Sequence, residues 1–376
     1  MDTATEGSAR ALFSLTGFWL LAVWCSFCAT TFALSTASAL SLKEQFLLEM
    51  TMQLPFWESK RNITVKKEAR TDQRFGCRPE ERPVEQLIHY GVINLNKPAG
   101  PSSHQVSDYV QRILGIAKAG HSGTLDPHVS GVLPIALARA TRIAQALLNA
   151  GKEYVTLMHL HHSVSEAVLR ETFRAFQGKI MQLPPVRSAV KRQERVREIY
   201  YLDILEIDNN DALFRVGCEA GTYIRKLVHD FGLKIGGAHM AQLVRTRAGP
   251  FCDRDWHSLQ DLADAYAFYK EEGNEKAIRR VILPFERAVD HLSKVWVFDN
   301  VVNNLCHGAG LGVQGISKLH DGIREKELVA VMTLKDELIC LGAAMLSSAD
   351  MLANERGLAV APEKVFMERD TYSTYK

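Results

Sequence analysis

The stretch from residue 120 to residue 137 most constrains the fold, because a glycine-rich loop there leads directly into a long apolar run. Its glycines at 120, 123 and 131 permit tight turns and close approach of a ligand. The loop carries one carboxylate, Asp126, and Pro127 favours an extended backbone at that residue. A lone aspartate in such a loop is ordinarily a turn residue. The residues that follow predict that the loop is anchored to a buried core: Val132, Leu133, Ile135, Ala136 and Leu137.

The composition is that of an ordinary globular protein, with 47% hydrophobic and 23% charged residues in a chain of 376. This length has room for two domains or three. A net charge of +2 does not by itself indicate a nucleic-acid partner. Among the seven cysteines only Cys25 and Cys28 form a C-x-x-C pair, without a second pair or a nearby histidine. We therefore expect no metal, no cofactor and no disulfide framework, but reduced thiols of an intracellular protein.

Residues 11–42 contain no charged side chain and resemble a secretory signal or a membrane span. Against this, acids outnumber bases in the first ten residues, and nine serines and threonines interrupt the run. Met50 or Met52 is an alternative start. We expect residues 1–50 to be an apolar extension, disordered or a start-site artefact, while a true anchor or targeting segment stays open.

A basic arm precedes the ordered core. From residue 60 to residue 82 there are eight basic and four acidic residues, and two prolines make the segment extended. Such a segment is a solvated linker or a strap that lies on another domain or on phosphate. We assign residues 51–87 to this arm.

Residues 88–292 alternate strand and helix patterns, which predicts an α+β catalytic domain with a mixed, largely antiparallel sheet and flanking helices. From Lys294 the pattern changes to short strands and turns, which predicts a small all-β barrel over 293–370. The expected helices lie near 102–114, 140–149, 165–176, after Arg225 through Leu227, Val228 and Phe231, over 258–292 up to Pro284, and in a further short segment. The expected strands are 91–98, which ends in a turn, 151–158, 200–207, 213–218, 222–225, 241–247, 295–298, 308–315, 316–319, 328–333 and 338–345.

The candidate chemistry is that of one carboxylate among aromatic and basic side chains. The sequence contains no phosphate-binding glycine motif, no zinc-protease motif, no nucleophile elbow and no dinucleotide fingerprint. Asp126 with aromatic residues and bases suits chemistry on a base that is extruded from a nucleic acid. Each residue also has an ordinary structural explanation, such as sheet packing for Tyr154. The residues alone therefore indicate only a candidate RNA- or DNA-acting enzyme.

Several motifs in a fixed order resemble the TruB/dyskerin branch of RNA pseudouridine synthases, most closely the archaeal H/ACA-guided enzyme. The resemblance covers about 54–370 and implies a pseudouridine-synthase domain followed by a PUA domain. The motifs are Gly91-Val-Ile-Asn-Leu-Asn-Lys-Pro98, Ser102-Ser-His104, Ala119-Gly-His-Ser-Gly-Thr-Leu-Asp-Pro127, Gly151-Lys-Glu-Tyr-Val155, Pro184-Pro185, Ala189-Val-Lys-Arg192, Glu219-Ala-Gly-Thr-Tyr-Ile-Arg225 and Gly237-Ala-His-Met240.

The resemblance implies catalytic roles for five residues. Asp126 matches the essential aspartate, which attacks the ribose C1′ or the uracil ring, or deprotonates the sugar. Arg225 matches the arginine that pairs with it. A guanidinium there lowers the pKa of the carboxyl group and orients it. Tyr154 matches the tyrosine that stacks under the uracil and helps to remove the C5 proton. His121 matches a residue that assists base flipping, and Lys97 supports the loop.

The resemblance also implies a substrate pocket and RNA contacts. Tyr223 and Leu243 fall at pocket-lining positions. Five bases lie between 187 and 197, and two more lie at 245 and 247, so both segments form positive patches. The expected RNA-binding residues are Arg187, Lys191, Arg192, Arg195, Arg245, Arg247, Gly308 and Lys318.

The implied function is isomerisation of uridine to pseudouridine in tRNA, at the T-loop, or in rRNA. In this family a guide RNA selects the uridine, small H/ACA proteins bind the catalytic domain, and the basic arm wraps the PUA domain. We expect these RNA and protein partners, no membrane partner, and a cytoplasmic location. Two alternatives stay open: a non-catalytic RNA-binding scaffold of the same fold, and a membrane-tethered protein defined by residues 11–42.

Overall fold

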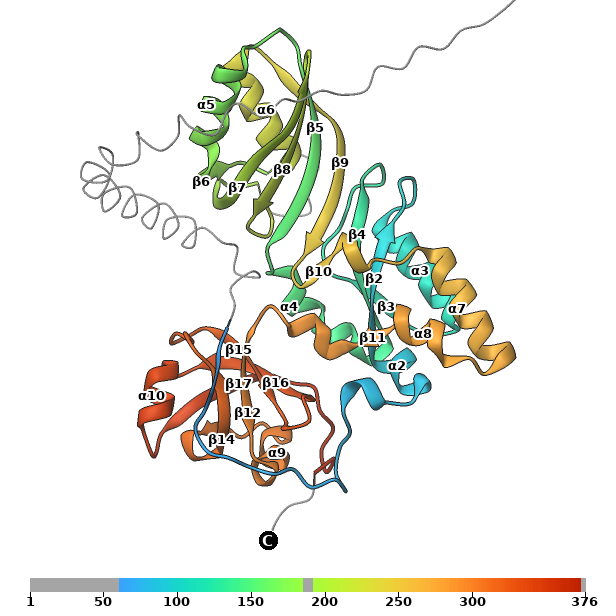
Figure 1. The fold of residues 1–376 in the computed structure, drawn as a ribbon, viewed down its shortest axis with the longest axis vertical. Coiled ribbons are helices and arrows are strands. Elements are labelled where there is room, and N and C mark those ends of the chain that lie inside the picture. The colour runs from blue at the N-terminus through green and yellow to red at the C-terminus, as the bar shows by residue number, and fades with distance from the viewer. Residues whose placement is uncertain (1–60, 185–191, 373–376) are drawn as a thin grey trace, which may run out of the picture. The chain divides into compact units, whose positions relative to one another are not determined.

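The computed structural model describes residues 61–184 and 192–372. Their strands form two sheets, one of ten strands and one of seven (Figure 1). The apolar extension over 1–50 and the predicted RNA-binding residues Arg187 and Lys191 lie outside the described residues.

The larger sheet joins two groups of antiparallel strands through one parallel pair, β4 and β9. Gly131 of β4 lies opposite Arg245 of β9. A Cβ on Gly131 would lie 2.2 Å from the Arg245 carbonyl oxygen, and its φ of +114° also disfavours other residues. Glycine is therefore required where the two groups meet. In spatial order the strands are β11 (Leu283–Pro284), β2 (Gly91–Lys97), β4 (Ser130–Leu137), β9 (Ala238–Ala248), β5 (Lys152–Leu160), β8 (Asp211–Cys218), β7 (Arg195–Asp208) and β6 (Gly178–Gln182), with β3 (Ala119–His121) beside β4 and β10 (Phe251–Cys252) beside β9.

Helices cover the two strand groups separately, and each group has its own hydrophobic core. Helices α3, α7 and α8 pack on the β2–β4 side, whereas α5 and α6 pack on the β5–β8 side (Figure 1). Helix α3 begins at a capping box between Ser102 and Gln105 and ends at Gly115, which adopts the left-handed conformation. The helices are α2 (Val84–Tyr90), α3 (Ser103–Leu114), α4 (Ala144–Leu148), α5 (Glu166–Phe176), α6 (Ile224–Ile235), α7 (Leu259–Glu272) and α8 (Glu275–Val281).

Some expected elements differ in the structure. The segment 222–225 is not a strand, because Tyr223 caps a helix that begins at Ile224. The helical segment after residue 258 breaks at Gly273, whose φ of +65° ends α7 before Asn274 caps α8. Strand β6 was not predicted. The mixed, largely antiparallel sheet with flanking helices is as predicted.

The smaller sheet belongs to the C-terminal module and has a core of its own. Its strands β12 and β15 are parallel neighbours, and its other strand pairs are antiparallel. The sequence predicted short strands here but missed both helices and the last strand. Its elements are β12 (Ser293–Val297), α9 (Asp299–Cys306), β13 (Leu311–Gly312), β14 (Ile316–His320), β15 (Leu328–Met332), β16 (Leu338–Ala344), α10 (Ser348–Ala353) and β17 (Leu358–Val365).

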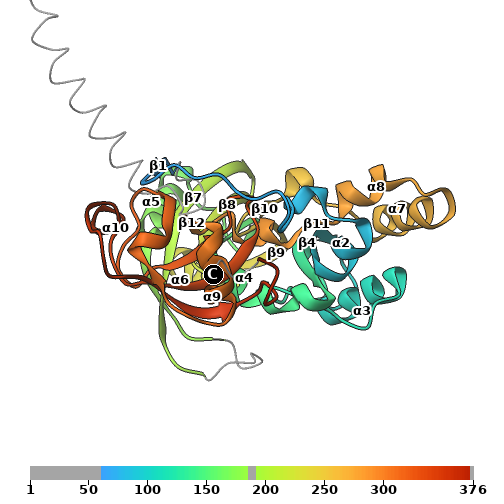
Figure 2. The same cartoon turned by 90° about the horizontal axis from the view of Figure 1, so that it is seen from below.

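The described part of the basic arm lies along this module. Strand β1 (Ile63–Val65) pairs with β14 and forms the edge of the smaller sheet. The Lys66 ammonium donates to the carbonyls of Met351 (2.5 Å) and Asn354 (2.7 Å), which end α10. Figures 1 and 2 both show the arm continuing from β1 to helix α2, which lies beside the larger sheet. Arm residues thus bind protein groups, which is not the behaviour of a solvated linker.

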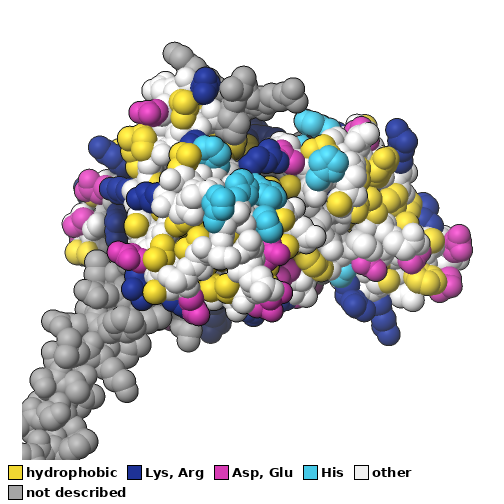
Figure 3. All heavy atoms as spheres, turned by 90° about the horizontal axis from the view of Figure 1, so that it is seen from above, with side chains coloured by type: hydrophobic (Ala, Val, Ile, Leu, Met, Phe, Trp, Pro, Cys, Tyr) yellow, Lys and Arg dark blue, Asp and Glu magenta, His cyan; other side chains and the backbone are white. Residues whose placement is uncertain are grey.

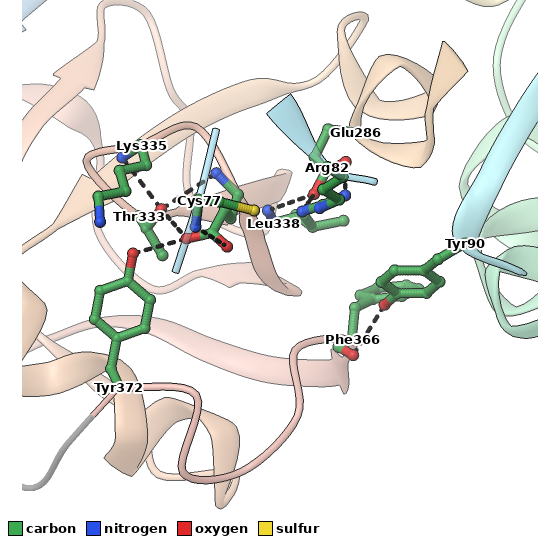
Figure 4. Close-up of polar contacts among 10 residues, drawn as sticks. Cys77, Arg82, Tyr90, Glu286, Thr333, Lys335, Leu338, Phe366 and Tyr372 are labelled. Atoms are coloured by element: carbon green, nitrogen blue, oxygen red, sulfur yellow. Dashed lines mark hydrogen bonds and ion pairs between the residues drawn. The ribbon is translucent and has the colours of Figure 1, made fainter. Parts of the chain in front are cut away.

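A buried ion pair and a shared apolar cluster join the two sheets. Arg82 and Glu286 lie 2.6 Å apart and are both almost fully buried. Nearby, the Tyr90 hydroxyl donates to the carbonyl of Phe366 at 2.9 Å (Figure 4). Residues of both sheets, such as Val132 and Trp296, belong to one core cluster. The junction is therefore a packed interior.

Candidate active site

Asp126 lies in the loop between β3 and β4, and its carboxylate faces solvent. Arg225, in the first turn of α6, donates to its Oδ2 at 2.5 Å. More than half of each side chain is exposed. The structure thus brings together two residues 99 positions apart, and it leaves the carboxylate accessible to a large substrate.

Buried side chains hold the backbone of this aspartate loop. The Lys97 ammonium donates to the carbonyls of Pro127 (3.1 Å) and Val129 (2.8 Å), which flank Asp126. The Ser103 hydroxyl accepts from the Leu125 amide at 2.9 Å and donates to its carbonyl at 3.1 Å. Lys97 is fully buried, and burial together with the Arg245 charge lowers its pKa. Lys97 therefore supports the loop, as expected, and makes no bond to the carboxylate.

Tyr154 and Leu243 provide an apolar surface beside the loop. Both are partly buried and pack against the cores of both strand groups. Burial raises the pKa of the Tyr154 phenol, and the neighbouring Arg245 charge opposes this rise. The Asp126 carboxylate is among the charges that act on the phenol. The predicted stacking tyrosine and nucleophile thus belong to one site.

Arg245 does not occupy the position expected of an RNA contact. Its side chain is 1% exposed, and its guanidinium donates to the carbonyls of Val132 (2.7 Å) and Gly123 (3.2 Å). Burial lowers the pKa of Arg245, and the neighbouring Tyr154 phenol opposes this decrease. The assignment of Arg245 to RNA binding is therefore corrected, because a buried guanidinium cannot reach a phosphate backbone. Arg247, two residues along β9, is partly exposed.

His121 lies at the end of β3, and its ring faces that of His104. The ring centroids are 4.8 Å apart in an edge-to-face arrangement. Burial, then the charges of His104 and Arg245, lower the pKa of His121. Neither ring nitrogen of His121 has a hydrogen-bond partner in the described structure. A neutral ring with unused polar atoms beside the loop is compatible with the expected contact to a displaced base.

Tyr223 anchors the start of α6. Its amide donates to the side-chain oxygen of Gln182 at 3.0 Å, and its carbonyl accepts from the Gln182 amide group at 3.3 Å. This pair ties β6 to the helix that carries Arg225. Gln182 could not be predicted as part of this site, because the contact joins residues 41 positions apart.

A groove of about 780 Å³ begins at Arg225 and runs along α6. Its cationic side chains outnumber its two acids, so it suits an anionic chain. The charged and histidine residues that line it are Arg192, Glu194, Arg225, Lys226, His229, Asp230 and Lys234.

Comparison with known proteins decides the family. The chain is 57% identical over 316 residues to "Probable tRNA pseudouridine synthase B" of Thermococcus kodakarensis, which covers 83% of this chain and 94% of the relative. The protein of the same name from Methanopyrus kandleri is 54% identical over 321 residues, 85% of this chain and 95% of that relative. Residues 111–224 match the TruB family pseudouridylate synthase N-terminal domain, and residues 225–290 match the tRNA pseudouridylate synthase B C-terminal domain.

The chain belongs to the TruB family of pseudouridine synthases. It is an isomerase that acts on RNA. Residues 51–107 match a DKCLD domain, and residues 293–366 match a PUA domain, so the smaller sheet is the predicted PUA module. The predicted family, fold class and enzyme class are confirmed.

Solved structures of the TruB family agree over nearly the whole described chain. A chain of the crystal structure of a Cbf5-Nop10-Gar1 complex has a TM-score of 0.81 and 54% identity, and covers 85% of this chain and 98% of that one. A chain of an H/ACA ribonucleoprotein bound to a substrate RNA containing 2′-deoxyuridine has a TM-score of 0.79 and 52% identity. The match covers 85% of this chain and 98% of that one.

Two predicted RNA contacts lie on the PUA module, away from the aspartate loop. Gly308 follows α9 with a φ of +87° and is exposed. Lys318 lies on β14 with its ammonium 4.9 Å from the centre of the Trp296 ring. Arg192 lines the groove beside Arg225, and Arg195 opens β7 opposite Gln182. The predicted RNA-binding residues therefore lie in two separate places in this TruB-family chain.

Other sites are not evident in the part of the chain that the structure describes. Histidines gather over the end of β5 and the start of β9 (Figure 3). There the Nε2 atom of His161 lies 3.0 Å from the Nδ1 atom of His239. Neither these nor other groups among the described residues form a cluster of three or more metal ligands. None of the described helices has the length and apolar character needed to cross a membrane.

Proposed function

We propose that this chain makes pseudouridine in tRNA, at the T-loop, and in rRNA, as the catalytic subunit of an H/ACA guide ribonucleoprotein. The names of its relatives support tRNA as a substrate. The similar chains in a Cbf5-Nop10-Gar1 complex and in a substrate-bound H/ACA particle support the guided role. We place this activity in the cytoplasm.

In the proposed reaction Asp126 acts on the target uridine, and Arg225 keeps the carboxylate ionised and oriented. The bond between C1′ and N1 breaks, the uracil rotates, and a bond forms between C1′ and C5. Tyr154 stacks under the uracil and accepts the C5 proton. The ion pair of 2.5 Å on an exposed, firmly held loop is the observation that carries this assignment.

Two regions bind the RNA in this proposal. The basic groove along α6 holds the substrate strand beside Asp126. The PUA module, through Gly308 and Lys318, holds the guide at a distance. Sequence selection by base pairing leaves the protein to bind shape and phosphate, so scattered basic groups suffice despite a small net charge.

The test of the chemistry is Asp126→Asn, which keeps the shape of the side chain. We expect single-turnover formation of pseudouridine to fall by at least about 10³-fold, with unchanged RNA binding in a filter assay. Arg215→Met, which removes an exposed arginine of β8 that pairs with Asp203, is the matched control and should keep its activity. Turnover by Asp126→Asn at the wild-type rate would refute the proposal.

The test of guidance compares two substrates. Purified chain is incubated with a T-loop transcript alone, and with an rRNA fragment in the presence and absence of a matching guide RNA. We expect modification of the rRNA fragment only with the guide. Equal modification without it would rule out the guided role while leaving the isomerase activity intact.

A further inference from the structure

Arg245 ties the two ends of the aspartate loop together. Its Nε donates to the Val132 carbonyl beyond the loop, and its Nη2 donates to the Gly123 carbonyl before Asp126. The required glycine at 131 lets the backbone of β4 approach this arginine closely. The position of the Asp126 carboxylate therefore depends on a guanidinium that does not touch it.

On its other side Arg245 meets Tyr154. The two residues are cross-strand partners of β9 and β5, and the guanidinium charge acts on the phenol. A β-bulge between Glu153 and Tyr154 sets this register, since Glu153 pairs with Arg247 and Thr246 is passed over. Bulges next to active sites commonly re-aim one side chain. Here the bulge separates Arg245, which is buried, from Arg247, which is not.

The charge of Arg245 reaches the other titratable groups around the loop. It helps to lower the pKa of Lys97 and of His121. It also adds to the effect of burial on Lys152, whose pKa falls to about 7. For Tyr154 it acts against burial and favours the ionised phenol. No carboxylate among the described residues pairs with Arg245, so its charge is available to the Tyr154 phenolate.

We propose that Arg245 is a positioning residue that fixes Tyr154 against the aspartate loop and stabilises the Tyr154 phenolate as this residue takes the C5 proton. This inference rests on the proposed roles of Asp126 and Tyr154. The phenolate is the form of Tyr154 that can accept this proton, and a nearby cation favours the ionised form of a phenol. Arginine suits the task because its fork binds two carbonyls while its charge stays beside the cross-strand tyrosine, which lysine cannot do.

The proton balance is simple. After C1′ joins C5, that carbon carries both the ribose and its original hydrogen, and the ring holds a double bond between N1 and C6. The Tyr154 phenolate takes the C5 proton, and the electron pair of the C5–H bond forms the C5–C6 double bond. The electron pair of the N1–C6 double bond takes a proton at N1. The isomerisation therefore gains and loses no proton overall.

The test compares wild type with Arg245→Lys, Arg245→Met and Tyr154→Phe in single-turnover reactions on RNA that carries uridine or [5-²H]uridine. We expect Arg245→Lys to slow the reaction by about 10–100-fold, with unchanged RNA binding and an increased isotope effect at C5. A variant that merely displaces Asp126 slows cleavage of the bond between C1′ and N1 instead, and this suppresses the isotope effect. Arg215→Met, an exposed arginine of the neighbouring strand, is the control.

A second measurement does not require turnover. NMR of [¹³C]tyrosine-labelled protein, with the Tyr154 resonance assigned from Tyr154→Phe, reports ionisation of the phenol as the pH rises. We expect Arg245→Lys to move this titration to higher pH, or beyond the measurable range. If Arg245→Met does not fold, Arg245→Lys carries both measurements.

The outcomes separate the two proposals. An isotope effect that stays at the wild-type size in Arg245→Lys, or a Tyr154 titration that does not move, overturns the role of Arg245. Absence of pseudouridine with the wild-type protein overturns the proposed function, and the NMR titration still decides whether Arg245 stabilises the phenolate.

Discussion

Two arginine–carboxylate pairs of nearly equal length lie in opposite surroundings. Arg225 and Asp126 are 2.5 Å apart with 63% and 54% of their side chains exposed, whereas Arg82 and Glu286 are 2.6 Å apart with 9% and 7% exposed. An exposed pair contributes little to stability because water solvates both charges when it opens. A buried pair leaves an uncompensated charge when one partner is lost. The same contact is thus available for chemistry in the active site and is structural at the junction.

The hydrogen bonds around each pair support this distinction. Glu286 accepts two bonds from Arg82 and one from the Leu338 amide, so the arm, the larger sheet and the PUA module meet at one carboxylate (Figure 4). Burial raises the pKa of Glu286, and Arg82 opposes this. Among the described residues, Arg225 is the one hydrogen-bond partner of the Asp126 carboxylate, which leaves lone pairs free for a substrate.

The largest expected effect comes from breaking the buried pair. Arg82→Met leaves the Glu286 carboxylate buried and unpaired, and should lower the free energy of unfolding by about 3–5 kcal/mol. Urea denaturation measures this loss. The double variant Arg82→Met/Glu286→Leu removes both charges and should recover most of it. A loss below about 1 kcal/mol in the single variant would contradict the assigned structural role.

Next in size is the loss of the exposed pair, which should appear in catalysis and not in stability. Arg225→Met should reduce single-turnover pseudouridine formation by about 10²–10³-fold, since the carboxylate loses its orienting charge. The free energy of unfolding should change by less than about 1 kcal/mol. A destabilisation similar to that of Arg82→Met would remove the distinction between the two pairs.

A smaller effect on stability is expected from a change of pH. It should arise from a buried histidine at the junction of the two sheets. His291 is 5% exposed, and burial lowers its pKa from 6.5 to about 4. The unfolded chain therefore binds the proton more readily, so stability is constant above pH 6.5 and falls as the pH drops toward 4. The expected loss is about 2–3 kcal/mol. Urea denaturation at several pH values checks this, and His291→Asn should flatten the profile.

The smallest effect tests a charge that is neither fully exposed nor buried. Lys66 makes no ion pair among the described residues, but its ammonium binds the last carbonyls of α10. Lys66→Met should cost about 1 kcal/mol by loss of these bonds. Thermal unfolding would measure it, and Lys67→Met, whose side chain is exposed beside it, should cost less.

The sequence could predict which residues come together in the candidate site, while their catalytic roles stay predictions. Asp126, Arg225 and Tyr154 stand in motifs whose order suggested a shared pocket, and the structure places them together. Lys97 was expected to support the loop, and a lysine at the end of a buried strand has little else to bind than loop carbonyls.

The sequence could not predict what depends on register. Arg245 and Arg247 have the spacing of two residues on one strand face, so both were assigned to RNA binding. The bulge opposite Tyr154 separates them, and its position depends on the packing of three strands that are distant in the chain. Likewise the residues before Arg225 have strand-like composition, and only the contact of Tyr223 with Gln182 shows that a helix begins there.

The pairing of β1 with β14 has a consequence for synthesis of the protein. Ile63 pairs with His320, so the strand that completes the PUA sheet is made long before the sheet itself. An unpaired sheet edge invites association with other chains. Because β1 has already left the ribosome when β14 emerges, the edge can be covered as soon as it forms. The arm thus replaces the β14 edge with the three-residue strand β1, at the expense of a slow, long-range closure.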